Sequence, residues 1–348
     1  MKSIAWAAAA LLLAIPVAGQ EVVRVAGDDI AIYDLAGRVE VVQGGGPDVV
    51  VRVHRGGADA ASLRVETGDI AGRPTLRVLF PDDEVVYPEL GRGSNTSVFV
   101  RDDGTFGNGG RDRGDRVRIR GSGSGLEAWA DLIIEVPAGR TVSAYLAVGS
   151  MDASAVDGNL RLDTGSGTVR ASDITGSLEI DTGSGRVTAN AIYGDLRIDS
   201  GSGRVTVTQV AGADVQIDTG SGSVEVTGVN ADRLSVDTGS GSVELNRVSS
   251  TDVTVDTGSG RVELELLTDV DRLELDTGSG SVTVRAPDDI GAMVEIDTGS
   301  GGIEVDFPLE VNLSSVRRDR VRGRLGDGRG TIRVDTGSGA VRIRRLND

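Results

Sequence analysis

From Leu160 onward, apolar and polar residues alternate along the chain with a period of two. Apolar pairs such as Leu178/Ile180 and Val187/Ala189 stand on either side of a short polar stretch, and the arrangement recurs many times. Such alternation is typical of strands that bury one face and expose the other. The pattern therefore predicts two short strands in each repeat, with a bend between them.

The polar stretch between the two strands reads Asp-Thr-Gly-Ser-Gly. Ile180 and Val187 are seven residues apart, so an uninterrupted strand would point them to opposite faces. The chain must therefore turn inside this motif, where aspartate can accept a backbone hydrogen bond and glycine frees the backbone. We assign this structural turn to the aspartate and glycines of each copy, exemplified by Asp163, Gly165, Gly167, Asp181, Gly183, Gly185, Asp218, Gly220 and Gly222.

The motif returns at a nearly constant spacing. Successive aspartates from Asp163 to Asp297 are 18 to 21 residues apart, and a gap of 38 precedes Asp335, as though a copy between Val311 and Arg324 had lost its motif. A short fixed period marks a solenoid, in which each unit buries its apolar residues against its neighbours. The fold class predicted is all-β, a parallel β-solenoid that is right-handed, as parallel crossovers nearly always are. An antiparallel meander is the rival, which the sameness of the repeats disfavours.

The chain divides into three parts. Residues 1–19 have the charged start, apolar run and small residues of a signal peptide. Residues 20–145 are expected to form irregular β coils, with a mobile loop near 82–125 that is rich in glycine and charge. Residues 146–348 form the regular solenoid, and its charged C-terminal end suits a capping coil. No membrane span is expected once the signal peptide is removed.

Charge and composition limit the kinds of partner and cofactor to be expected. The formal net charge is -17, which disfavours nucleic acid and anionic membrane surfaces because both would be repelled. The chain has no cysteine and a single histidine, His54, so neither a disulfide nor a Cys/His metal centre is expected. We expect no cofactor, with calcium as the one alternative.

The recurring aspartate raises the question of catalysis. Asp-Thr-Gly is the motif of aspartic proteases, but those need two carboxylates sharing a proton across a cleft, and here the acids stand in series. We therefore reject that interpretation. A ladder of calcium ions on stacked carboxylates is an alternative to a purely structural role; its candidate ligands are Asp181, Asp199, Asp218, Asp237, Asp256 and Asp276.

Two further possibilities concern the surface of the solenoid. The motif threonines could present an outward hydroxyl face, as ice-binding solenoids do. A polysaccharide hydrolase or lyase could use pairs of aspartates as acid and base. Sugar binding usually needs aromatic side chains, however, and only 3% of this chain is aromatic.

The segments "VRDDGTFG", "VPAGRTVSAYLAVG" and "GDGRGTIRVDTGSG", together with the serial motif copies, resemble the DUF4097 family of bacterial adhesin-like proteins. The resemblance implies a single-chain β-solenoid exported to the cell envelope and carries over no catalytic residues. We therefore predict a non-enzymatic, adhesin-like protein that uses a rigid solenoid as a binding or structural scaffold. It is expected in the periplasm, at the cell surface or outside the cell, with an envelope glycan or protein as its partner.

Overall fold

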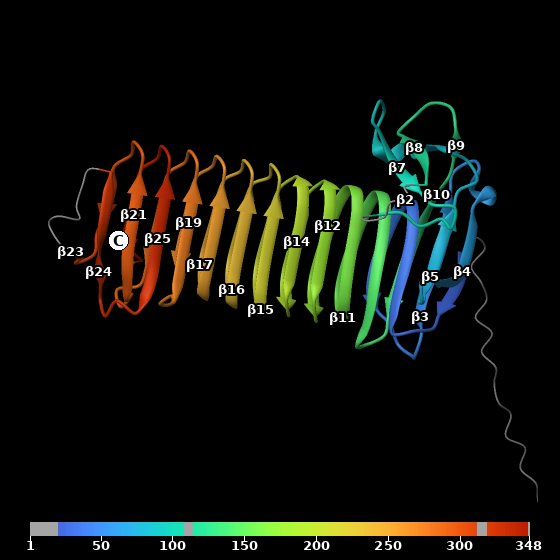
Figure 1. Ribbon diagram of the computed structural model, residues 1–348. Coiled ribbons are helices and arrows are strands. Elements are labelled where there is room, and N and C mark those ends of the chain that lie inside the picture. The colour runs from blue at the N-terminus through green and yellow to red at the C-terminus, as the bar shows by residue number, and fades with distance from the viewer. Residues whose placement is uncertain (1–19, 108–113, 312–318, 347–348) are drawn as a thin grey trace, which may run out of the picture.

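The computed structural model describes residues 20–107, 114–311 and 319–346, so the predicted signal peptide lies outside the described residues. These residues form a rod of stacked β coils that carries a small lobe over its N-terminal part (Figure 1). In the described part of the chain, the helices are two short 3-10 turns, η1 (Ala60–Ser62) and η2 (Pro88–Leu90). None of the described helices is long and apolar enough to cross a membrane.

The regular rod is a parallel solenoid. Equivalent residues of neighbouring coils pair with one another: Leu178 with Leu196 and Asp181 with Asp199, for example. The parallel pairing confirms the predicted fold class and excludes an antiparallel meander for these coils. The strands that build them are β11 (Arg140–Thr175), β12 (Leu178–Ser184), β13 (Val187–Tyr193), β14 (Leu196–Ser202), β15 (Val205–Thr219), β16 (Val224–Thr238), β17 (Val243–Thr257), β18 (Val262–Leu266), β19 (Arg272–Thr277) and β20 (Val282–Ala286).

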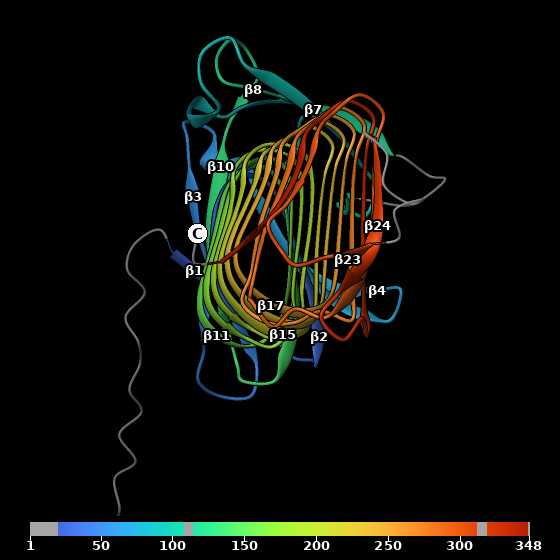
Figure 2. The ribbon, with the colours of Figure 1, turned by 90° about the vertical axis from the view of Figure 1, so that its left-hand side faces the viewer.

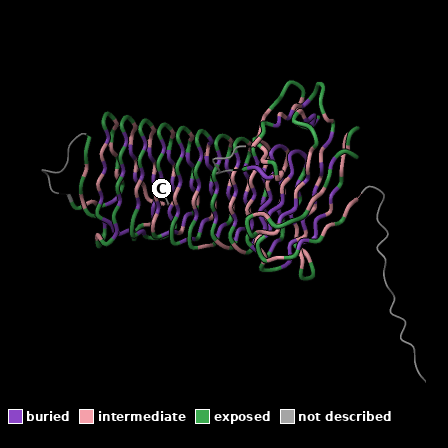
Figure 3. The backbone as a smooth tube through the Cα atoms, turned by 45° about the vertical axis from the view of Figure 1, so that its right-hand side comes forward, coloured by how far each residue is buried: buried purple, intermediate pink, exposed green. Residues whose placement is uncertain are grey.

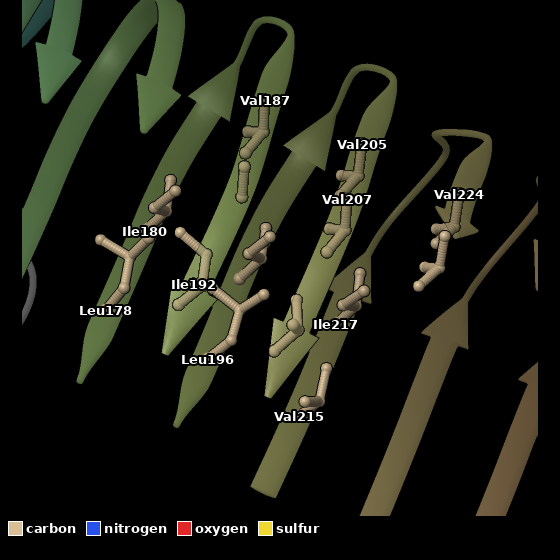
Figure 4. Packing of buried hydrophobic residues seen from close by; sticks show 14 of the residues in the cluster. Leu178, Ile180, Val187, Ile192, Leu196, Val205, Val207, Val215, Ile217 and Val224 are labelled. Atoms are coloured by element: carbon tan, nitrogen blue, oxygen red, sulfur yellow. The ribbon is translucent and has the colours of Figure 1, made fainter. Parts of the chain in front are cut away.

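The predicted apolar positions make the core. Leu178, Ile180 and Val187 are at most 1% exposed, and Figure 4 shows them in line with their counterparts on the next coils. Seen nearly along the axis, the coils superpose (Figure 2), and along the strands of the regular coils buried residues alternate with more exposed ones (Figure 3). Each coil is too small to fold alone. Stacking stabilises it, because its apolar residues are buried against the equivalent residues of the next coil.

A second bend lies between the strand that follows the motif and the next inward residue, for example Ile192, in the coils from β11 to β17. Ile192 follows Ala191, which has a φ of 54°, in the left-handed region that side chains other than glycine seldom adopt. The same conformation is found in six successive coils, at Ala155, Asp173, Ala191, Gln209, Gly228 and Arg247. Since most of these residues are not glycine, the periodic bend left no glycine signal.

The N-terminal part of the rod is a mixed sheet. Strand β2 (Asp29–Gln43) pairs in parallel with β11 and with β10 (Trp129–Val136), so it continues the parallel stack. The remaining strands include antiparallel pairs and so depart from the predicted coils: β1 (Gln20–Val25), β3 (Val49–Gly56), β4 (Arg64–Ile70) and β5 (Arg73–Leu79). Antiparallel strands close the end of a parallel stack, where a free edge would otherwise recruit other chains.

In place of the mobile loop expected near 82–125, the described residues form a folded lobe; residues 108–113 lie outside them. We call residues 82–127 the lobe. Its four strands make one sheet: β6 (Glu84–Val86), β7 (Asn95–Val100), β8 (Asp115–Arg120) and β9 (Leu126–Glu127). The segment has few apolar residues, but Val85, Phe106 and Ile119 join Ala147 and Val148 of the rod in one buried cluster. The rod supplies the apolar partners that the local composition lacks.

The C-terminal coil does not cap the rod, which corrects the prediction. Its strands β25 (Gly330–Thr336) and β26 (Val341–Arg345) lie inside the stack, β25 between β19 and β21 (Ala292–Thr298), and β26 between β20 and β22 (Ile303–Val305). Figure 1 shows β25, in red, in this position. The insertion is possible because the motif at Asp335 pairs equally well with the copies at Asp276 and Asp297.

The end of the rod is covered by an antiparallel strand instead. Strand β24 (Arg320–Leu325) runs antiparallel to β21 and to β23 (Glu310–Val311), so this segment is not a parallel coil that lost its motif. Arg320 and Arg322 pair with Asp297 and Glu295 on β21. Charged side chains on an outer strand discourage further strand addition.

Candidate functional site

The motif copies form columns along one edge of the rod, which we call the motif edge. The chain turns there between β12 and β13, that is, between the strands that carry Ile180 and Val187 (Figure 4). The aspartates stack in register and face outward, and most are exposed. The second residue of every copy is buried instead, at most 1% exposed: Thr164, Thr182, Ser200, Thr219, Thr238, Thr257, Thr277, Thr298 and Thr336. An outward hydroxyl face formed by the threonines is therefore excluded.

The buried threonines differ in how they are satisfied. Thr238 Oγ1 donates to the carbonyl oxygen of Gly222 on the preceding coil at 3.1 Å, and the N–H of Gly222 donates to Thr219 Oγ1 at 3.1 Å. The hydroxyl of Thr182 has no hydrogen-bond partner. In the later coils the threonine hydroxyl thus links successive bends, whereas Thr182 buries its hydroxyl without such a link.

The different hydrogen bonding of Thr182 and Thr238 can be tested with a pair of variants. Thr182→Val removes an unpaired buried hydroxyl and should stabilise the protein by about 1 kcal/mol. Thr238→Val breaks a buried hydrogen bond and should destabilise it by about 1 kcal/mol. Urea unfolding of both variants measures the two changes; equal shifts in the same direction would show that the hydroxyl's bonding is irrelevant.

The lobe overhangs the first motif copies and creates a pocket of about 200 Å³, the lobe pocket. Its floor includes Asp163 and Gly165 of β11 and Asp181 of β12. The other side is formed by Thr96–Val98 of β7 and by Phe106 and Gly107. The sequence predicted aspartates in series with no cleft between them; at the first two copies the lobe adds a recess over these aspartates.

Phe106 is held in place by a group of aromatic rings. Its ring meets Tyr33 edge-on with centroids 5.5 Å apart, and Tyr33 stacks on Tyr145 at 4.4 Å. Burial, together with the neighbouring Tyr145, raises the pKa of Tyr33 to about 12, so this phenol stays neutral. Offset or edge-on ring pairs each contribute about 1 kcal/mol beyond area burial. The lobe side of the pocket is therefore supported by packed rings.

Asp163 is the unusual member of the aspartate column. Its side chain is 13% exposed, and its Oδ2 atom has no hydrogen-bond partner. Burial first, and the charge of Asp181 second, raise its pKa to about 6. Arg161 lies 3.8 Å from Asp163 but donates a 2.8 Å hydrogen bond to Glu179 instead. The pocket thus holds a carboxyl group with a raised pKa.

Farther along the motif edge the acids are close to solvent. Burial and the flanking acids Asp218 and Asp256 raise the pKa of Asp237, and burial with the flanking acids Asp256 and Asp335 raises that of Asp276. Each coil contributes one motif carboxylate. Across the residues that the structure describes, no group of three or more His, Cys, Asp or Glu side chains gathers as a metal site. The calcium candidates Asp181, Asp199, Asp218, Asp237, Asp256 and Asp276 therefore lie in single file, and a calcium ladder stays a hypothesis.

The glycines predicted to form the turns lie at contacts between coils. Gly167, Gly185 and Gly222 lie where neighbouring coils approach each other most closely. The residues that sequence reasoning missed are Phe106 and the β7 segment 96–98, because nothing in a single sequence indicates that the lobe folds over the first two motif copies. The hint available was apolar Phe106 within a polar, glycine-rich stretch.

The architecture defines a class of all-β repeat proteins, the parallel β-solenoids, with an accessory lobe over the first regular coils. Residues 119–344 match the family described as Toastrack DUF4097, which is well over half of the chain, and the chain belongs to this family.

No curated protein matches the chain. Among solved structures, a "putative cell adhesion protein from Clostridium sporogenes ATCC 15579" is similar at 11% sequence identity and a TM-score of 0.23; the alignment covers 94% of this chain and 98% of that one. Values this low carry no argument about function.

Proposed function

We propose that this protein is an exported, non-enzymatic component of the cell envelope, an adhesin-like scaffold that holds a binding site on a rigid rod. Family membership supports the solenoid scaffold. The proposed binding site is supported by a contrast between the uniform coils of the rod and the lobe pocket, where this uniformity is interrupted. Along the rod, equivalent residues repeat with a single motif acid per coil, whereas the lobe pocket adds aromatic and hydroxyl side chains to the motif acids.

Export and envelope binding are tested directly. We expect fractionation of the producing bacterium to find the chain outside the cytoplasm, cleaved near residue 19. The purified chain from Gln20 should be retained by isolated cell envelopes, and extraction of glycan or protein from those envelopes should show which component holds it. A chain that stays in the cytoplasm at full length, or that envelopes fail to retain, would contradict the proposal.

A polysaccharide hydrolase is the second candidate, and one observation favours it. Asp163 has a pKa of about 6 and lies in register with Asp181 on the neighbouring strand. Parallel neighbours are about 4.8 Å apart, and retaining glycosidases place their two carboxyl groups about 5 Å apart. An assay for released reducing ends at pH 5 to 6, with Asp163→Asn as control, decides between the two. Glycan cleavage that the variant loses would replace the scaffold proposal.

A further inference from the structure

The coil formed by β25 and β26 lies in the rod out of chain order. Other regular coils follow the chain, as β15, β16 and β17 do, each stacked on the one before. Strand β25 instead lies between β19 and β21 (Figure 1), and β26 lies between β20 and β22 in the same way. We call the space that this coil fills, between β19–β20 on one side and β21–β22 on the other, the coil slot.

Both walls of the coil slot offer the same pairing to the coil inside it. Asp335 pairs with Asp276 on one wall and with Asp297 on the other, and the residues around it follow in register. Ile332 and Val334 of the inserted strand are at most 1% exposed. The same coil from a second copy of the chain would form the same strand pairs and bury the same side chains. Exchange of an identical element is therefore a low-cost route to a dimer.

The connector that leads into the coil slot is short and makes a sharp crossing. Residues 326–329 pass from β24, antiparallel on the outer side of β21, to β25 on the inner side. They cross the chain close to Gly291, where the carboxylate of Asp327 leaves no room for a side chain. Gly326 and Gly328 adopt φ values of 51° and 70° in this crossing. Short connectors of this kind invite exchange, because they can open into an extended link between two copies.

We propose that two copies of this chain exchange their β25–β26 coils, so that each copy places its coil in the coil slot of the other. The product is a dimer of two rods joined near the ends that lie away from the lobes (Figure 1), and it carries two lobes. This inference goes beyond the proposed function and does not depend on it, because the partner is a second copy of the same chain.

Single cysteines test the exchange directly, since the chain has no cysteine of its own. Glu274 on β19 and Arg333 on β25 are partners in register, at a strand spacing that a disulfide can bridge. Glu274→Cys and Arg333→Cys are purified separately, one of them with a size tag, warmed together below the unfolding transition and then oxidised. Exchange brings the two thiols together, and non-reducing denaturing electrophoresis measures the mixed disulfide dimer.

The matched control pair is Arg197→Cys mixed with Gln216→Cys. These residues are also partners in register, but on β14 and β15, which belong to coils stacked in chain order. We expect at least about tenfold more mixed dimer from Glu274→Cys with Arg333→Cys than from the control pair, because exchange holds only the first two thiols at a high effective concentration. Equal amounts from the two pairs would show random collision and overturn the proposal, as would the absence of a mixed dimer.

A second pair of variants guards against a folding defect. Thermal unfolding of each cysteine variant shows whether it is folded. If Glu274→Cys is not, Glu295→Cys takes its place, because Glu295 on the opposite wall of the coil slot also pairs with Arg333. The same excess of mixed dimer over the control pair is then expected, and its absence again overturns the exchange.

Discussion

Gly185→Ala should destabilise the protein by more than about 4 kcal/mol, enough to unfold the rod or disrupt it locally. A Cβ atom at this position would lie 1.7 Å from the carbonyl oxygen of Gly167 on the preceding coil. The backbone cannot move away freely, because the N–H of Gly185 donates to the carbonyl of Ser202 on the next coil at 3.0 Å. The clash is between two main chains, so no side-chain rotation relieves it.

The matched control is Gly228→Ala, also a glycine with positive φ on the regular rod. Its φ is 75°, and the nearest atom to an added Cβ is 3.8 Å away. Ala191 and Gln209 hold the equivalent position in other coils, with φ of 54° and 57°. The expected cost is therefore about 1 kcal/mol, the usual penalty for a side chain in the left-handed region. Urea unfolding followed by circular dichroism compares the two; a loss at Gly228 as large as at Gly185 would refute the close-approach argument.

The same contact explains why the motif is richer in glycine than a bend alone requires. An added Cβ on the second glycine would fall 1.6 to 1.9 Å from a carbonyl oxygen of the adjacent coil in every regular copy, from Gly167 to Gly339. From the sequence we attributed these glycines to a turn. The structure adds that they let successive coils stack at strand spacing. A single repeat cannot reveal this, because the clash involves two coils.

The core was predictable because it depends on local alternation. Leu178, Ile180 and Val187 are buried where the period of two places them, and the constant spacing fixed the parallel stack. The order of the last coils was not predictable. The motif at Asp335 is the same as that at Asp297, so sequence alone gives no reason for the C-terminal coil to lie inside the stack. Identical repeats specify how coils pair but not which coils are neighbours.

The lobe was unpredictable for a different reason. Its composition is that of a loop, and its fold depends on apolar contacts with Leu35, Ala147 and Val148, which are distant in sequence. The lobe pocket followed from that packing, since Asp163 belongs to the same motif as the exposed aspartates but is covered by the lobe. In a repeat protein, identical residues acquire different properties through their non-repeating neighbours.

Asp34→Asn should stabilise the protein at neutral pH, with a gain that grows as the pH rises. Asp34 is 1% exposed, in strand β2. Burial raises the pKa of its carboxyl well above the ordinary value, with Asp131 adding to the rise and the N–H groups of Ala36 and Leu35 opposing it in part. The unfolded chain ionises this group near pH 4. Folding at pH 7 must therefore either keep the proton on Asp34 or bury its charge.

The direction in which stability changes with pH follows from the raised pKa of Asp34. The stability associated with Asp34 is fully present below about pH 4 and is lost as the pH rises toward the folded pKa, by up to about 1.4 kcal/mol per pH unit. Asparagine does not titrate, so wild type and variant should be closest in stability near pH 4 and diverge by at least about 1 kcal/mol at pH 7. Urea unfolding from pH 4 to pH 8 measures the divergence. Asp232→Asn, the same change at an exposed site, is the control and should retain the wild-type slope. A gain that does not vary with pH would mean that the carboxyl of Asp34 is not the titrating group.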